Sequence, residues 1–548
     1  MNKDKKVLTF LIAGMVMVAF LGYSFGVIME RREVGNVMEL VNNYINKQGR
    51  STTLGEVMAI VDGNYVDSVN FDTLSEKMIP LLLKELDPHS SFIPAREVLA
   101  SQESLRGDFD GIGVMFNMLT DTIIIQDVIP GGPSSKVGII SGDRIIKIND
   151  TIVAGKKINS NLIVGKLKGK GGTAVKVGIK RKGVKELIDI NIVRGKVEIK
   201  SVDASFMITP QIGYVKLLRF SLTTHQELKD AIKALKAKGM KSLILDLQSN
   251  GGGYLDQAIL IANEFLPKGK MIVYTEGRGK RLTEQYADGT GEFIGDDITI
   301  LINEVSASAS EIVSGALQDN DIGTIVGRRS FGKGLVQQQI DLSDGSLLLL
   351  TIARYHTPTG RCIQRPYDKG EEEYYGDIEN RYLHGEMVTK DSIKQNHSLR
   401  YTTPKGKVVY GGGGIMPDVF VPADTSRYSQ FEIKALSGIY RIRYVSEYVD
   451  KNRRTLERIS TKAEFDRYFD KNKDLIYNGY KRYFFQNEKE RGAASEWTKI
   501  EKDLKILFKA SIGDATKLKT NAFYIYMSDY DEIIKQGLAV TKEKLRKR

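Results

Sequence analysis

Cysteine is nearly absent from this chain of 548 residues, whose one thiol is Cys362. A single cysteine excludes an intramolecular disulfide and any metal site built from several thiolates. Histidine is also scarce: the five histidines are scattered, and no two of them have the HxxxH spacing of a zinc site. We therefore expect neither a metal nor a cofactor.

The chain also lacks a separate block of basic residues. Its net charge is +12, but lysines and arginines are interleaved with acids along the whole sequence. A basic strip would indicate a nucleic acid or an acidic membrane as partner, whereas interleaved charge is typical of a soluble surface. We expect no nucleic-acid partner. The hydrophobic content of 41% and the charged content of 27% are ordinary for a globular protein of several domains.

One long apolar run is present, the 22 uncharged residues 7–28. It is long enough to span a bilayer as a helix. Lysines precede it, while the acids and arginines of residues 30–33 balance one another. The positive-inside rule then predicts a cytoplasmic stub (residues 1–6), a single-pass inner-membrane anchor (7–28), and a remainder that lies in the periplasm or otherwise outside the cytoplasm. A cleaved signal peptide is the alternative.

The pattern of apolar residues changes three times along the rest of the chain. Residues 34–100 carry apolar residues at helical spacing, and residues 101–197 form short β-branched runs separated by turns. Residues 198–424 alternate strands and helices before returning to strands, and residues 425–548 are again helical in pattern. The sequence thus predicts a multidomain α+β protein. For residues 425–548, a dimerisation or docking module and a packing appendage both stay open.

The β-rich segment contains a glycine loop, Gly111-Ile112-Gly113-Val114, that leads into a strand. Successive backbone amides in such a loop can hold a carboxylate. Downstream, GGPSSKVGIISGDRIIKIND at 131–150 predicts a short helix and then a Gly-Asp turn into a strand. With both features the segment resembles a PDZ domain, which binds peptide C-termini by strand addition.

The segment 303–337 holds the candidate chemistry. An apolar strand, Ile298–Ile302, precedes a serine-rich turn that contains Ser308, and a helix is expected over 311–317. Such a strand–turn–helix can expose a hydroxyl beside helix N-terminal amides. Lys333 follows between two glycines, and burial would lower its pKa. Serine-rich turns usually cap helices and most lysines are solvated, so a helix cap stays an alternative.

A second glycine loop follows a buried strand, Ser242–Leu247, and reads QSNGGG over 248–253. No Lys-Ser or Lys-Thr follows its glycines, so the pattern does not favour a phosphate-binding loop. The same geometry supplies backbone N–H donors to an oxyanion.

Seven ordered motifs identify a family. They are LDPHSSF (86–92), the PDZ loop, LILDLQSNGGG (243–253), NEVSASASEIVSGALQD (303–319), SFGKGLVQ (330–337), TIARYHTPTGRCIQ (351–364) and YGGGGIMPDV (410–419). The chain from about residue 50 to 422 resembles the C-terminal processing proteases of peptidase family S41. The resemblance implies a crotonase/ClpP-like α/β serine protease core with its cap over residues 198–424.

The resemblance also implies roles for individual residues. The family's nucleophile falls on Ser308, its general base on Lys333 and its supporting glutamine on Gln337. The oxyanion donors fall on the backbone N–H groups of Ala309 and Gly252, with a neighbouring glycine as the alternative to Gly252. In an extended strand Gln337 would lie on the same face as Lys333 and orient its amine.

Other positions depart from the family or receive minor roles. Gln248 and Gly251 stand where the family has an arginine and a proline, and Lys168 stands where the PDZ segment usually has an arginine. Lys168 is the candidate for a gating contact of the PDZ domain. Asp319 is expected to be a surface or capping residue, and His89 a polar turn residue.

The resemblance implies a serine endopeptidase that acts outside the cytoplasm on proteins whose unstructured, apolar C-termini its PDZ domain recognises. A catalytically silent PDZ adaptor on a protease fold is the alternative from another class. A CoA-using enzyme of the related crotonase architecture conflicts with the extracytoplasmic address. Whether the chain forms a homodimer or works with an adaptor protein stays open.

Overall fold

The structure is a computed structural model that describes residues 53–547 except 119–120, 281, 424–427, 437 and 490–491. They fall into two compact units that divide between Ile79 and Pro80. The first contains helix α3 (Thr53–Asn64) and the start of α4 (Phe71–Lys84). The predicted anchor at 7–28 lies outside the described residues, and none of the described helices is long and apolar enough to cross a membrane.

The second unit is built around a six-stranded sheet in the order β10-β11-β12-β15-β16-β21. The bounds are β10 (Val202–Thr209), β11 (Ile212–Leu217), β12 (Ser242–Asp246), β15 (Asp297–Ile302), β16 (Gly323–Gly327) and β21 (Val419–Phe420). Only the β10–β11 pair is antiparallel. Parallel strands are covered on both faces, which explains their continuous apolar runs.

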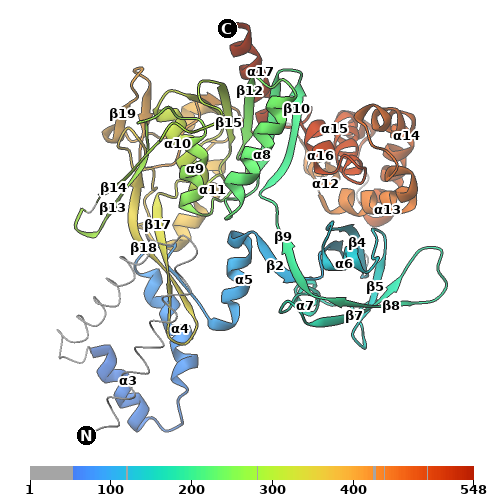
Figure 1. The fold of residues 1–548 in the computed structure, drawn as a ribbon, viewed down its shortest axis with the longest axis horizontal. Helices are drawn as coiled ribbons and strands as arrows, with labels where there is room; N and C mark the ends of the chain where they lie inside the picture. The colour runs from blue at the N-terminus through green and yellow to red at the C-terminus, as the bar shows by residue number, and fades with distance from the viewer. Residues whose placement is uncertain are drawn as a thin grey trace. The chain divides into compact units, whose positions relative to one another are not determined.

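Alternate residues of the central strands enter two different cores. Leu243 and Ile300 join one core with helices α8 (Thr224–Ala237), α9 (Leu255–Asn263) and α10 (Ala309–Asp319). Ile244 and Leu301 face the other way, into a core that includes residues of α16 (Thr520–Met527) and α17 (Glu532–Lys547). Figure 1 shows α8, α9 and α10 beside this sheet. Helices α16 and α17 therefore complete the core on the second face of this sheet.

A second sheet has the order β1-β18-β13-β14, and β17 also pairs with β18. Its strands are β1 (Ser91–Ile93), β13 (Met271–Gly277), β14 (Leu282–Tyr286), β17 (Leu335–Asp341) and β18 (Leu347–His356). Ser91 of β1 is in register with Leu349, and Gln337 of β17 with Thr351. The sheet thus brings the turn before β1, residues 87–90, beside β17, although some 250 residues separate them in sequence.

The PDZ domain has a sheet in the order β3-β4-β5-β7-β8, with β6 paired to β5. Its strands are β3 (Val114–Asn117), β4 (Ile123–Val128), β5 (Arg144–Ile148), β6 (Thr151–Ile152), β7 (Ala174–Lys180) and β8 (Ile188–Val193). Among the described residues β3 pairs only with β4 and is an edge strand. Strands β2 (Asp108–Gly111) and β9 (Gly195–Glu198) pair at its base, after helix α5 (Ala95–Arg106), and α7 (Ser160–Leu167) lies within the domain.

The helices α12 (Gln430–Leu436), α13 (Gly438–Leu456), α14 (Lys462–Asn487) and α15 (Ala494–Gly513) share an aromatic-rich core of their own. They also contact the PDZ sheet: Arg144 pairs with Asp450 at 2.7 Å, and Asn117 donates a hydrogen bond to Ser446. The strand β21 ends at Phe420 and α12 begins at Gln430, while α16 and α17 pack against the core of the six-stranded sheet. For residues 425–548 as a whole, the two alternatives stay open.

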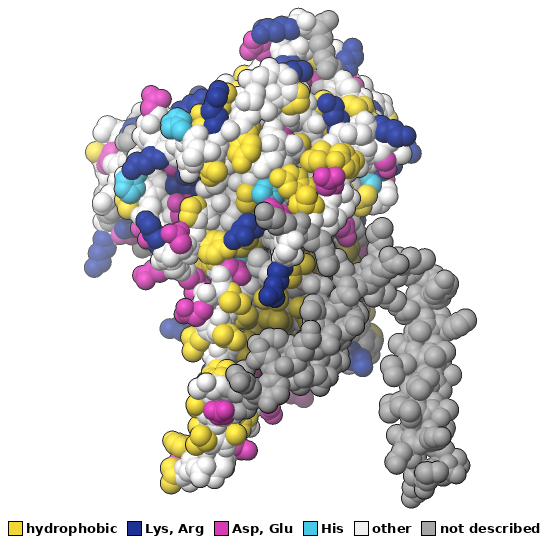
Figure 2. Space-filling model, turned by 90° about the vertical axis from the view of Figure 1, so that its left-hand side faces the viewer, with side chains coloured by type: hydrophobic (Ala, Val, Ile, Leu, Met, Phe, Trp, Pro, Cys, Tyr) yellow, Lys and Arg dark blue, Asp and Glu magenta, His cyan; other side chains and the backbone are white. Residues whose placement is uncertain are grey.

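Charges on the molecular surface are mixed in sign. On the face shown in Figure 2, Lys and Arg side chains are interspersed with Asp and Glu side chains, and hydrophobic patches lie between them. No continuous basic strip is visible among the described residues of this face.

Candidate active site

Ser308 lies at a sharp turn between β15 and α10. Its backbone has φ 53° and ψ −114°, a conformation that residues with a Cβ rarely adopt. It is the N-cap residue of α10, yet its side chain makes no capping hydrogen bond. A strained strand-to-helix turn that leaves the serine hydroxyl uncommitted is the geometry of an activated nucleophile.

Glu311 holds the backbones of Ser308 and Lys333 together. Its Oε2 accepts hydrogen bonds from the Ser308 N–H at 2.8 Å and from the Lys333 N–H at 2.9 Å. Its Oε1 accepts from the Gly332 N–H and the Ser330 hydroxyl. Burial raises the pKa of Glu311 to about 7, against these hydrogen bonds, which lower it. Sequence analysis did not assign Glu311, although Ser308-Ala-Ser-Glu311 has the spacing of a capping box.

Tyr355 of β18 makes a second link between the same two residues. Its hydroxyl contacts the Lys333 carbonyl oxygen at 2.6 Å and the Ser308 carbonyl oxygen at 3.2 Å. Two side chains therefore hold the predicted nucleophile and base side by side. Ser308 Oγ and Lys333 Nζ, which both belong to described residues, form no hydrogen bond with one another here. Catalytic hydrogen bonds of this kind commonly form only when substrate binds.

Lys333 is largely buried, and Gln337 is its side-chain partner. Lys333 Nζ donates to Gln337 Oε1 at 2.9 Å. Burial lowers the pKa of Lys333, while the charges of Asp87 and Glu311 act in the opposite direction. The predicted contact between Lys333 and Gln337 is therefore present. It does not arise because both residues lie on one face of a strand, since Lys333 precedes β17 and a bulge separates Val336 from Gln337.

The turn at 87–90 positions Gln337. The His89 carbonyl oxygen accepts a hydrogen bond from Gln337 Nε2, so the amide oxygen of Gln337 faces Lys333. Asp87 holds the turn by accepting from the N–H groups of His89 and Ser90 and from the Thr351 hydroxyl. Burial would raise the pKa of Asp87, but these bonds and one from the Ser90 hydroxyl outweigh it and hold that pKa below its usual value.

His89 is a turn residue, as expected, and its side chain is half-buried. Its Nε2 lies 2.8 Å from the Tyr374 hydroxyl. Burial, together with the positive charges of Lys333 and Arg365, lowers the pKa of His89 to about 4, although Asp87 opposes this. His89 is therefore neutral at pH 7. A neutral His89 places no positive charge beside Lys333 at this pH. Burial, and not repulsion from His89, is therefore what lowers the pKa of Lys333.

The two expected oxyanion donors differ. The Ala309 N–H, at the first residue of α10, has no hydrogen-bond partner among the described residues. The Gly252 N–H lies next to Ser308 but donates to Asn250 Oδ1 at 2.9 Å. Of these two amides, that of Ala309 is the free donor among the described residues, whereas Gly252 would have to exchange its partner.

Gly252 cannot carry a side chain without disturbing the nucleophile. A Cβ there would lie 2.8 Å from the Ser308 Cβ, and the backbone has φ +100°. We expect Gly252→Ala to lower kcat on the order of 100-fold, because small displacements of reacting groups have effects of that size. The matched control is Gly251→Ala, whose Cβ meets nothing within 4 Å. Equal activity of the two variants would show that Gly252 does not support Ser308.

Gln248, at the position of the family's arginine, is buried and turned inward. Its backbone N–H and its Nε2 donate to the carboxylate of Asp246, and its carbonyl oxygen accepts from Lys216 Nζ at 2.6 Å. Lys216 also pairs with Asp246 at 2.9 Å. The Gln248 side chain thus stabilises the base of the glycine loop.

The expectation for Asp319 is wrong. Asp319 is neither on the surface nor a cap: its side chain is fully buried and pairs with the equally buried Arg361 at 2.7 Å. It also accepts from the hydroxyls of Thr357 and Thr359. A buried, fully bonded ion pair fixes the segment after β18 against α10.

The PDZ loop leaves amides available. Its carbonyl oxygens at Ile112 and Gly113 accept from the N–H groups of Ser134 and Ile129. The N–H groups of Ile112 and Gly113 have no partner among the described residues. Lys168 contacts Glu103 of α5 and lies 4.6 Å from the Phe109 ring centroid, so it links the PDZ domain to the helix before it.

Comparisons with known proteins agree with this architecture. The family model of peptidase family S41 matches residues 211–369, and that of the PDZ domain matches residues 111–192. The chain is 38% identical over 328 residues to the carboxy-terminal-processing protease of Bartonella bacilliformis, covering 59% of this chain and 74% of that one. It is 35% identical over 318 residues to a probable CtpA-like serine protease of Staphylococcus aureus, covering 58% and 63%.

A solved structure, the photosystem II D1 C-terminal processing protease, matches this chain at 24% identity and a TM-score of 0.36. The match covers 69% of this chain and 88% of that chain.

No group of three or more His, Cys, Asp or Glu side chains among the described residues is arranged to hold a metal ion.

Proposed function

Because the chain belongs to the carboxy-terminal-processing serine proteases of peptidase family S41, we propose that Ser308 and Lys333 form its catalytic dyad. The observation that carries the proposal is the shared anchoring of both residues by Glu311 and Tyr355, next to a lysine whose pKa burial lowers. A neutral lysine beside a strained serine can serve as the general base and the nucleophile of acyl transfer.

The proposed reaction proceeds in two halves. Neutral Lys333 takes the hydroxyl proton of Ser308 as Oγ attacks the scissile carbonyl carbon. The resulting ammonium returns that proton to the leaving amine, and the amine fragment departs. Lys333 then takes a proton from the water that attacks the acyl-enzyme, and it returns this proton to Ser308 Oγ as the carboxylic acid is released. Gln337 accepts a hydrogen bond from Nζ throughout and so positions the amine.

Backbone amides stabilise the oxyanion in this proposal. The free Ala309 N–H is the first donor, assisted by the N-terminal dipole of α10. Gly252 becomes the second donor once its N–H leaves Asn250. This exchange of partners offers a physical reason for a site that assembles fully only around substrate.

The PDZ domain is proposed to deliver the substrate. The edge strand β3, which pairs only with β4 among the described residues, can accept a peptide as an additional strand, and the free amides of Ile112 and Gly113 can hold its terminal carboxylate. The substrates are then proteins with unstructured, apolar C-termini. Lys168, through Glu103, is positioned to couple peptide binding to α5.

The test uses a fluorogenic reporter with an apolar C-terminus and its C-terminally amidated twin, which lacks the carboxylate. We expect amidation to raise KM about tenfold, with kcat changed little, because a charge-assisted contact to the loop is lost. Equal KM values would contradict carboxylate recognition. A parent chain that binds the reporter without cleaving it would favour the silent adaptor.

We further propose that catalysis takes place outside the cytoplasm, with residues 7–28 as the inner-membrane anchor. The apolar run and its flanking charges support this address. Digestion of the chain by a protease added to the outer side of intact inner membranes tests it, and full protection would contradict it.

A further inference from the structure

A cavity of about 1030 Å³ lies in the C-terminal helices, away from Ser308. Residues of α14, α15 and α17 line it, together with Ser528 and Asp529 of the segment before α17. Apolar atoms of Phe469, Ile506 and Leu538 form part of its wall. The mechanism proposed above does not use this cavity.

Lysines dominate the polar lining. They are Lys473, Lys502, Lys505, Lys509, Lys535 and Lys542. Three acids share the lining, namely Asp470, Glu501 and Asp529. The cavity is therefore cationic, although the surface as a whole mixes charges of both signs.

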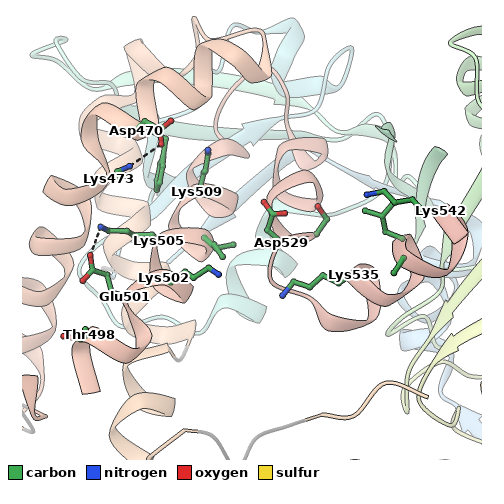
Figure 3. A pocket seen from close by; sticks show the side chains of 15 residues that line it. Asp470, Lys473, Thr498, Glu501, Lys502, Lys505, Lys509, Asp529, Lys535 and Lys542 are labelled. Atoms are coloured by element: carbon green, nitrogen blue, oxygen red, sulfur yellow. Dashed lines mark ion pairs between the residues drawn. The ribbon is translucent and has the colours of Figure 1, made fainter. Parts of the chain in front are cut away.

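Two of these lysines, Lys502 and Lys542, form no ion pair with any described residue. The other four are paired: Lys473 with Asp470, Lys505 with Glu501, Lys509 with Asp466, and Lys535 with Glu532 at 2.9 Å. Figure 3 shows Lys502 of α15 and Lys535 of α17 pointing toward one another across the opening. Like charges that converge on open space are stabilised when an anion enters between them.

We propose that this cavity binds an acidic polypeptide segment that carries apolar side chains. The carboxylates of such a segment would pair with Lys502 and Lys542, and its apolar side chains would cover the wall around Ile506. The lining contains no arginine, whose planar fork is the preferred partner of phosphate. The three acids in the lining also oppose a uniformly charged polyanion, whereas the N–H groups of a polypeptide can donate to them.

The helices that line the cavity pack against two different parts of the molecule. Helix α17 is seated on the protease sheet, where Lys544 pairs with Asp297 at 3.0 Å and Ile533 and Ile534 enter the core. Helices α14 and α15 belong to the aromatic-rich cluster that contacts the PDZ domain. An acidic segment in the cavity therefore bridges the protease core and the helices beside the PDZ domain.

The test measures the binding of a fluorescein-labelled peptide of four Glu-Glu-Leu repeats to the full-length chain by anisotropy. The chain carries Ser308→Ala so that the probe is not consumed, and the peptide is amidated so that it offers the PDZ domain no carboxylate. We expect saturable binding that weakens with added salt. The double variant Lys502→Glu/Lys542→Glu should weaken it about tenfold or more, because two attractive charges become repulsive.

The matched control is Lys451→Glu/Lys471→Glu, which makes the same change of charge at two exposed lysines of α13 and α14 outside the cavity. This control should leave the affinity unchanged. Absence of binding, or equal loss in both double variants, would overturn the proposal. So would equal binding of a Gln-Gln-Leu peptide, or binding of inorganic polyphosphate in preference to the acidic peptide. None of these results depends on whether Ser308 is the nucleophile.

Discussion

Replacing Ser308 or Lys333 by alanine is expected to lower kcat/KM for the apolar-tailed reporter by on the order of 10⁴-fold or more. Ser308→Ala removes the attacking oxygen, and Lys333→Ala removes the amine of the residue whose backbone Glu311 and Tyr355 anchor beside that of Ser308. Residues that act as a unit give non-additive losses. The double variant should therefore be no less active than the worse of the two single variants.

The measurement is reporter cleavage at pH 8, with thermal unfolding as the check that each variant folds. Lys241→Ala, at an exposed lysine far in sequence from both residues, is the control and should keep parental activity. Cleavage that survives Ser308→Ala would mean that another residue is the nucleophile. Cleavage that survives only Lys333→Ala would assign the base elsewhere.

Gln337→Glu is expected to move the rising limb of the pH–rate profile upward by about 1–3 pH units. The introduced carboxylate would lie where Gln337 Oε1 now lies, 2.9 Å from Lys333 Nζ. A negative charge favours the ammonium and raises the pKa of Lys333, whereas the base must be neutral to act. The variant would therefore lose activity at neutral pH and recover part of it at alkaline pH.

The matched control is Gln338→Glu, which adds the same charge one residue along β17, where side chains point to the other face of the sheet. It should shift the profile little. The Gln337→Glu variant also loses the amide that donates to the His89 carbonyl oxygen, so its maximal rate should be below that of the parent. An unshifted limb in Gln337→Glu would show that Lys333 does not set the pH dependence.

The core strands and the serine–lysine region could be predicted from sequence because their signals are local. Unbroken apolar runs such as Ile298–Ile302 indicate strands buried on both faces, and small residues around Ser308 indicate a tight turn. The expected helix over 311–317 is the middle of α10. Order and spacing of motifs then identified the family, which no single motif would have done.

The supporting contacts could not be predicted because they join distant parts of the chain. The spacing from Ser308 could have indicated Glu311 as part of a capping box. Its hydrogen bonds to Gly332 and Lys333, however, exist only after β17 is in place. The His89 contact with Gln337 depends on the pairing of β1 with β18. Asp319 looked like a surface residue because nothing in its neighbourhood reveals that Arg361 is buried against it.

The C-terminal helices show the same limit. An amphipathic pattern predicts that α17 buries one face, but not which surface covers that face. In the structure the partner is the sheet of β12, β15 and β16, where Thr541 contacts Thr299 at 2.8 Å. The C-terminal helices therefore belong to two parts of the structure. Helices α12 to α15 form the aromatic-rich cluster, and α16 and α17 form part of the protease core.

The most direct test of the dyad is the ionisation of Lys333 itself. Lysines labelled with carbon-13 at the ε position are titrated by NMR in the full-length chain, and the signal lost in Lys333→Ala assigns the residue. We predict that the pKa of Lys333 lies well below the value of about 10.4 for an ordinary lysine. It should equal the pKa of the rising limb of kcat/KM, and Gln337→Glu should raise both values together. An ordinary lysine pKa, with activity already maximal at neutral pH, would contradict the role of Lys333 as the general base.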